Sequence, residues 1–364
     1  MSRHFYWLDL IRFSAALIVV TAHARAISFV EYGGLVDSEK TLLITVFYAV
    51  TRIANEAVVV FFVLSGFLVG GRALERIIQG KFRPSDFLID RFVRIMLPLI
   101  PALFFTAIIR LVIDGDFDII VLVANILSLQ GVFFPVFGEN GPLWSLSYEV
   151  WFYVLAYAVG IIVIKKTFDM TAITLFVIVT AIFTYLNSVY LFCWLIGALI
   201  YHRSPDRFSL VVLLCSIFLS IYSVVAIQIG SESVSISIKN IDIYLLGVDV
   251  SRILLSLSMA IAMQQVLFLK PTNKISISAD KIGTIMAASS YTLYLVHLPM
   301  LHLLSYLGVE RADKVNFYTI SVYLFTICVC LVVSWLLYLL FEKHTIVVRQ
   351  YIKNACYLKF GTEK

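Results

Sequence analysis

An apolar stretch near the start of the chain carries side chains that could do chemistry inside a membrane. Residues 8–27 are apolar enough to enter a bilayer, yet they include Asp9, Arg12 and His23. Ionisable groups at membrane depth are costly and usually have a function there. Arg12 and His23 are eleven residues apart, so a helix would place them on nearly the same face, about 16 Å apart along its axis. Asp9 falls on that side as well, where it could pair with Arg12.

The imidazole of His23 suggests proton transfer as the chemistry of this face. Histidine titrates near neutral pH, so it can take a proton from a hydroxyl group and return it, as acyl or phosphoryl transfer to an alcohol requires. A lone histidine in a membrane helix could equally bond to a neighbouring backbone carbonyl. The cation of Arg12 on the same face favours the functional interpretation.

A second group of charges lies in residues 70–98, where six Lys or Arg side chains accompany three acidic ones. Such a surplus is ordinary in a cytoplasmic loop. Arg91 and Arg94, however, are three residues apart and would share one helical face, where two guanidinium groups could bind phosphate. A coenzyme A thioester fits that charge, and an acidic lipid headgroup fits it nearly as well.

A third group lies in residues 138–153, GENGPLWSLSYEVWFY. The glycines and proline predict a turn, and the aromatic residues that follow, Trp144 and Tyr148 among them, are typical of a helix that enters the membrane. Glu149 lies a little over one turn inside that boundary. It could be a helix-end carboxylate facing water. Alternatively, it could lie at the depth of His23 and orient the imidazole or bind an acceptor hydroxyl.

Two further segments are less specific. Residues 289–301 place Tyr294 and His297 shortly before Pro299, which would kink a helix and free a backbone carbonyl. His297 could there serve the structure as readily as a substrate. Ser65 and Gly66, in the middle of another apolar run, are the small residues that close helix packing requires.

The elements that position these residues must be membrane helices. Of the 364 residues, 61% are hydrophobic and only 14% charged, and the mean hydropathy is +0.96, far outside the range of soluble domains. The sequence therefore predicts an all-α, polytopic integral membrane protein. Counting apolar segments of about 20 residues gives about ten transmembrane helices, near residues 8–28, 43–70, 94–113, 144–164, 170–187, 188–201, 208–229, 243–269, 284–306 and 317–341.

The distribution of Lys and Arg predicts the orientation. Placing both termini in the cytoplasm puts most of these residues on the cytoplasmic side, including the basic residues of 70–98. Residues 119–134 form a shorter apolar run, which we interpret as an interfacial or re-entrant helix, with one further span as the alternative. We assign residues 1–345 to one transmembrane domain and residues 346–364 to a short basic cytoplasmic tail.

Other classes of protein are less compatible with the sequence. The formal charge of +5 is accounted for by membrane-flanking loops, so no nucleic-acid partner is expected. The chain has no G-x-S-x-G elbow, Walker loop, dinucleotide-binding glycine pattern or zinc-ligand spacing, which argues against a nucleotide hydrolase and predicts no metal.

Taken in order, five short motifs resemble those of the acyltransferase-3 family of integral-membrane acyltransferases. The matching positions are Arg12 and His23; Phe61, Phe62, Ser65, Gly66 and Phe67; Arg91, Arg94, Ile95 and Pro98; Trp144, Ser145, Leu146 and Glu149; and Ser290, Tyr294, His297 and Pro299. Glu342 also stands where the family often has a glutamate, although His344 replaces the proline that commonly follows it. The resemblance covers nearly the whole chain.

The resemblance implies transfer of an acyl group, usually acetyl, from cytoplasmic acyl-coenzyme A to a hydroxyl of an extracytoplasmic or lipid-linked glycan, such as O-antigen or exopolysaccharide. It also implies a bacterial inner membrane, and the chain looks like the stand-alone type without a periplasmic esterase-like domain. From the motifs and the resemblance together we expect His23 and Glu149 to be catalytic and Arg12, Arg91 and Arg94 to bind the donor. We expect the substrate to be bound by Trp144, Tyr148, Tyr294 and His297.

The expected mechanism joins the motifs. The phosphates of acyl-coenzyme A would bind Arg91, Arg94 and Arg12, and the pantetheine arm would extend between helices to His23. His23 would deprotonate the acceptor hydroxyl or carry the acyl group briefly. A transporter of a glycan or organic anion is the main alternative, with the same polar residues lining its path. A membrane scaffold is a third alternative, but a scaffold has little use for polar residues on a helix face in lipid.

Overall fold

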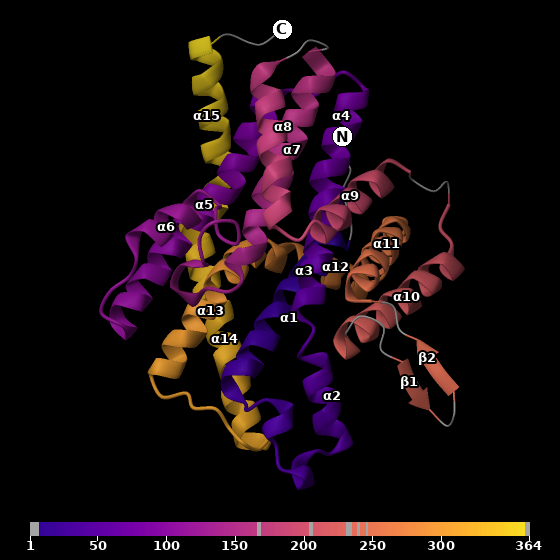
Figure 1. Cartoon of the computed structure of the whole chain (residues 1–364), viewed down its shortest axis with the longest axis vertical. Coiled ribbons are helices and arrows are strands. Elements are labelled where there is room, and N and C mark those ends of the chain that lie inside the picture. Colours follow the sequence, from indigo (N-terminus) through magenta and orange to yellow (C-terminus); the bar gives the residue numbers. More distant parts are fainter. Residues whose placement is uncertain are drawn as a thin grey trace. The chain divides into compact units, whose positions relative to one another are not determined.

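The structure, a computed structural model, describes residues 7–165, 169–203, 207–230, 235–238, 241–244 and 247–360. Its long helices confirm the all-α class of an integral membrane protein (Figure 1). The helices are α1 Leu8–Ser28, α2 Leu42–Val50, α3 Ala54–Ser65, α4 Gly71–Ile78, α5 Pro84–Ile113, α6 Ile119–Ile126, α7 Leu143–Lys165, α8 Met170–Tyr185, α9 Val189–His202, α10 Leu210–Ile229, α11 Val248–Val266, α12 Lys274–Ala287, α13 Ser290–Tyr306, α14 Phe317–Leu340 and α15 Thr345–Phe360. A short antiparallel pair, β1 Ser235–Ile238 and β2 Ile241–Tyr244, separates α10 from α11.

Within the described residues, six segments are long and apolar enough to cross a membrane. They are Leu8–Ser28, Leu42–Ile78, Pro84–Ile113, Leu143–Lys165, Leu210–Ile229 and Phe317–Cys356. The helices α8 and α9 are apolar but shorter. Each of the ten predicted segments contains a described helix, although the segment 243–269 begins in β2 and its helix α11 covers Val248–Val266. The number of spans and the cytoplasmic location of both termini stay predictions.

The helices belong to two compact units, each built from three separate parts of the chain. The first unit contains Met1–Ala15, Asn55–Lys81 and Val154–Thr284. The second contains Ala16–Ala54, Phe82–Tyr153 and Ile285–Lys364. The residues of α1 are therefore divided: Arg12 belongs to the first unit and His23 to the second.

In the first unit, α9 packs closely against the single π-helical turn Gly66–Gly70 that follows α3. A Cβ atom at Gly66 would lie 2.0 Å from the carbonyl oxygen of Trp194, and one at Gly197 would lie 2.3 Å from that of Val63. Trp194 Nε1 also donates to Ser65 Oγ over 3.3 Å. The predicted packing role of Ser65 and Gly66 is thereby confirmed, because only glycine allows the two backbones to approach so far.

The pair α10 and α11 shows how this unit is adapted to lipid (Figure 1). Small polar side chains are buried between the two helices, where Ser220 and Ser258 share a hydrogen bond of 2.8 Å. Large apolar side chains such as Phe218, which is 74% exposed, lie on the outer surface of α10. This arrangement, with small polar residues inside and large apolar ones outside, is typical of helices that associate in a membrane.

In the second unit, α5 packs against α13, α15 and α6, and α13 also packs against α14 (Figure 1). The helix α5 begins at Pro84 and not near residue 94, since proline is well suited to the first turn of a helix. Arg91 and Arg94 consequently lie on the helix itself. The residues assigned to a cytoplasmic tail form most of α15, whose Lys353 Nζ lies 3.2 Å from Asp86 Oδ1 and 2.8 Å from Asp90 Oδ1 on α5.

The run 119–134 contains only the eight-residue helix α6. At about 12 Å, this helix is too short to cross a bilayer, so the alternative of a further span is wrong. The chain after α6 turns back and is held by Asn125, whose Nδ2 donates to Pro135 O over 3.0 Å and whose Oδ1 accepts from the Phe137 amide over 3.1 Å. This turn leads into α7.

Candidate active site

Two histidines meet in the second unit. His23 Nδ1 on α1 lies 2.9 Å from His297 Nε2 on α13, and the rings are inclined by only 13° to each other, with centroids 5.1 Å apart. His297 is 0% exposed, and its Nδ1 lies 3.0 Å from the carbonyl oxygen of Leu293, one turn earlier on α13. Both ring nitrogens of His297 are therefore occupied by hydrogen bonds.

This chain of hydrogen bonds fixes the tautomer of each ring. A carbonyl oxygen can only accept, so His297 Nδ1 carries the hydrogen that it donates to Leu293 O. In the neutral ring, His297 Nε2 is then an acceptor, and His23 Nδ1 must donate to it. Both rings are neutral in this scheme, as suits groups at membrane depth. Neutral His23 keeps a lone pair on Nε2, the nitrogen that can accept a proton.

The helix that carries His23 has small or branched side chains at its buried positions. Ala16, Val20 and Ala24 are each 0% exposed. Backbone bonds anchor the end of α1 to the chain after α13: the Ala312 amide donates to Ser28 O over 2.9 Å, and the Val30 amide donates to Ala312 O over 3.0 Å.

Pro299 contributes to the environment of His297 in the way the sequence predicts. Proline has no amide hydrogen, so Leu295 O loses the partner that residue 299 would supply in a regular helix. Asn140 Nδ2 donates to that carbonyl instead, over 2.8 Å. The turn before α7 is thereby attached to α13 next to the histidine pair.

Tyr294, predicted to bind substrate, is buried against the start of α7. Its hydroxyl lies 2.7 Å from Ser145 Oγ and donates to Pro142 O over 3.2 Å. Of the other predicted substrate residues, Tyr148 is buried beside Trp144 and Phe152, and His297 faces His23. These contacts give each of the three buried rings a packing role.

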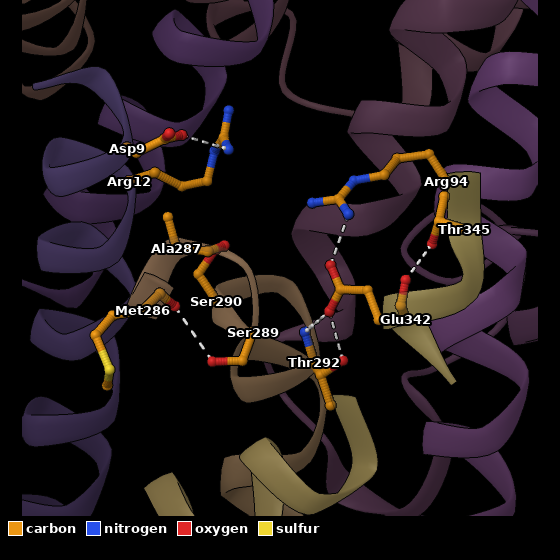
Figure 2. Close-up of polar contacts among 10 residues, drawn as sticks. All are labelled: Asp9, Arg12, Arg94, Met286, Ala287, Ser289, Ser290, Thr292, Glu342 and Thr345. Atoms are coloured by element: carbon orange, nitrogen blue, oxygen red, sulfur yellow. Dashed lines mark hydrogen bonds and ion pairs between the residues drawn. The ribbon is translucent and has the colours of Figure 1, made fainter. Parts of the chain in front are cut away.

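A second cluster lies where α5, α13 and the end of α14 meet (Figure 2). Arg94 Nη1 donates to Glu342 Oε1 over 2.7 Å. The other carboxylate oxygen, Oε2, accepts from the Thr292 amide over 3.1 Å and from Thr292 Oγ1 over 2.6 Å. Figure 2 also shows Ser289, whose hydroxyl donates to Met286 O over 3.2 Å. Glu342 therefore ties α5 to the first turn of α13.

Arg91 and Glu149 belong to this same region. The Arg91 guanidinium lies 5.6 Å from the centre of the Tyr153 ring, and the Tyr153 hydroxyl donates to Glu149 Oε1. Tyr291 lies under the Arg94 guanidinium, 5.7 Å from ring centre to Cζ, and interacts electrostatically with Glu149. Two cations, two carboxylates and two phenols are thus gathered at one level of the unit.

The two clusters are separated by a short length of α13. Thr292 and His297 are five residues apart on this helix, which is about 7.5 Å along its axis. The predicted donor-binding residues Arg91 and Arg94 lie at one level, and the imidazole of His23 at the other. Glu149, which we expected beside His23, is found at the level of the arginines, and among the described residues it is His297 that contacts the His23 ring.

Arg12 lies in the first unit, where its Nη1 is 3.2 Å from Asp9 Oδ1. This pair was predicted from the spacing and is confirmed. Tyr291 and Thr292 also contribute to the arginine cluster and were not predicted, because these residue types at this spacing do not indicate a buried polar role. The available signal in the sequence was their position directly after two serines at the start of α13.

Residues 5–339, nearly the whole chain, match the family described as an acyltransferase domain. Neither a curated protein nor a solved structure matches the chain.

Proposed function

The chain belongs to this acyltransferase family, and we propose that it transfers an acyl group, most simply acetyl, from cytoplasmic acyl-coenzyme A to a hydroxyl of an extracytoplasmic or lipid-linked glycan. The observation that supports this most directly is the contact of His23 Nδ1 with His297 Nε2, because the tautomer inferred from it leaves a lone pair on His23 Nε2. A general base of this kind is what transfer to a hydroxyl needs.

In the proposed reaction, His23 Nε2 takes the hydrogen of the acceptor hydroxyl as the oxygen attacks the thioester carbonyl. A C–O bond forms and the C–S bond breaks, with its electron pair moving to sulfur. The His23 imidazolium then returns the proton to the thiolate, so the products are an ester and the free thiol of coenzyme A. His23 ends the cycle neutral, as it began.

The same lone pair permits a two-step route. His23 Nε2 would attack the thioester first, and the C–S bond would break with its electron pair moving to the coenzyme A sulfur. The acceptor hydroxyl would then attack the acyl group, release neutral His23 and give its proton to the thiolate. Acid quenching within a single turnover distinguishes the routes, since labelled acyl-histidine accumulates only in the second.

Arg91 and Arg94 are suited to the anionic end of the donor. Guanidinium groups form charge-assisted hydrogen bonds with phosphate, and these two lie one turn apart on α5. In this proposal the phosphates of the donor lie at the arginines and its thioester lies near His23.

The proposed function is tested with purified protein in detergent or nanodiscs and labelled acetyl-coenzyme A, with and without candidate glycans. We expect labelled glycan from the wild type and none from His23→Ala. His202→Ala removes an exposed imidazole on α9 and should keep wild-type activity. Full activity of His23→Ala, or binding of glycan with no transfer from any acyl-coenzyme A, would contradict the proposal and favour a transporter.

A further inference from the structure

We propose that His297 is a positioning residue for His23: it holds the His23 imidazole in the one tautomer that can act as a base. This inference rests on the proposed function only for its kinetic consequence. The tautomer itself is a property of the resting protein, and it can be measured without any reaction.

His297 is placed to act on His23 and not on a substrate. Its side chain is completely buried, its Nδ1 donates to Leu293 O, and its Nε2 accepts from His23 Nδ1. An imidazole has only these two hydrogen-bonding atoms. Binding an acceptor sugar through His297 would require breaking one of the two bonds in an apolar environment.

The direction of the two hydrogen bonds determines which nitrogen of each ring carries the hydrogen. Leu293 O has no hydrogen to give, so it forces the hydrogen of His297 onto Nδ1 and leaves Nε2 to accept. That acceptor forces the hydrogen of His23 onto Nδ1. Without it, neutral His23 could carry its hydrogen on Nε2, where the ring could donate to a hydroxyl but could not deprotonate it.

Both the backbone and the ring of His297 are held in place. Cys330 Sγ on α14 lies 3.7 Å from His297 O, and Asn140 bonds the carbonyl of Leu295. The ring is held by its two hydrogen bonds, to Leu293 O and to His23 Nδ1, and the Tyr294 ring is 6.0 Å away, centre to centre. The constraint of the Leu293 carbonyl is thereby transmitted to His23.

A neutral imidazole has an advantage over a carboxylate in this role. When His23 takes a proton, the bond from its Nδ1 to His297 Nε2 becomes charge-assisted and stronger, so the imidazolium is stabilised as it forms. Before that moment the pair has no net charge, and no buried anion has to be compensated inside the membrane.

Two substitutions separate positioning from packing. In His297→Gln, the end of the side chain reaches the position of Nε2, and its amide oxygen can still accept from His23 Nδ1. In His297→Asn, the shorter amide can replace Nδ1 and donate to Leu293 O, but it leaves His23 Nδ1 without an acceptor. Both variants place a polar amide where a polar imidazole now stands, and both are expected to fold.

We expect His297→Asn to lower kcat by about 10²-fold, within the range that general base catalysis contributes. His297→Gln should stay within about tenfold of wild type, and the KM for acyl-coenzyme A should be unchanged in both. The thermal unfolding midpoint of each variant controls for folding. Equal losses in the two variants, or a larger loss for Gln, would overturn the proposal.

The tautomer is measured directly by nitrogen NMR of protein labelled with ¹⁵N-histidine, with the His23 signals assigned from the His23→Ala spectrum. We expect His23 to be protonated at Nδ1 in wild type and in His297→Gln, and to populate the other tautomer in His297→Asn. Protonation of wild-type His23 at Nε2 would refute the inference. If the wild type transfers no acyl group while its tautomer is as expected, the proposed function fails and the positioning role stands.

Discussion

Arg94 and Glu342 form an ion pair of 2.7 Å although they are 248 positions apart in the sequence. The Glu342 side chain is 1% exposed, and that of Arg94 is 35% exposed. The carboxylate is thus fully enclosed and bonded through both oxygens, while part of the guanidinium remains accessible. Arg94 therefore stabilises the fold through its ion pair with Glu342, and the exposed part of its guanidinium group is accessible to an anionic ligand.

Removing the carboxylate should be strongly destabilising. Glu342→Ala leaves the buried amide and hydroxyl of Thr292 without their acceptor, and each buried group left unsatisfied costs about 1–3 kcal/mol; Arg94 also loses its ion pair. We expect a large fall in the thermal unfolding midpoint in detergent. Glu310→Ala removes an exposed carboxylate and should leave the midpoint unchanged. Equal midpoints for the two variants would show that the pair contributes nothing to stability.

Binding of the donor should depend on Arg91. Within the described residues Arg91 forms no ion pair, and its guanidinium lies over the Tyr153 ring. Loss of a charge-assisted bond to phosphate costs about 1.5–3 kcal/mol, which is roughly 10- to 100-fold in Kd. We expect Arg91→Ala to lose the thermal protection that coenzyme A gives. Arg76→Ala, at an exposed position on α4, is the matched control and should keep it.

The contact between α9 and the π-helical turn should not tolerate a methyl group. In Gly66→Ala and Gly197→Ala, the new Cβ would lie 2.0 Å and 2.3 Å from backbone oxygens, so the helices must move apart. Overpacking of this kind typically costs about 1–3 kcal/mol. Gly33→Ala, where a Cβ meets nothing within 4 Å, is the control. A midpoint for Gly66→Ala as high as that of Gly33→Ala would contradict the observed packing.

Tyr294→Phe should affect stability and leave acceptor recognition intact. The substitution removes the hydroxyl that bonds Ser145 and Pro142, and a buried hydrogen bond contributes about 0.5–1.5 kcal/mol. The unfolding midpoint should fall slightly, and Ser145→Ala combined with it should add less than the sum of the two single effects. A rise in KM for the glycan without a change in midpoint would instead restore the substrate-binding role.

Features that depend on local spacing could be predicted from the sequence. The membrane helices follow from apolar composition, and the pair of Asp9 and Arg12 follows from helical periodicity. The free carbonyl before Pro299 follows from the chemistry of proline alone. Each of these needs only the residues of one helix.

Features that depend on the register between helices could not be predicted. The partner of His23 is 274 residues away, and the amide that satisfies Leu295 O comes from Asn140, 155 residues away. The depth expected for Glu149 assumed that distance from the helix end sets its level. The actual level is set by how α7, α5 and α13 pack, which no single segment contains.

The separation of Arg94 and Glu342 along the chain also has a consequence for biosynthesis. At about 5–20 residues per second, the ribosome takes roughly 10–50 s to make the segment between them. During that interval Arg94 has been made but Glu342 has not, and once α13 is made its first turn lacks the Glu342 carboxylate as well. The second unit therefore closes only when the last part of the chain arrives, and a nascent chain that stalls before residue 342 exposes an uncompensated cation to membrane chaperones and proteases.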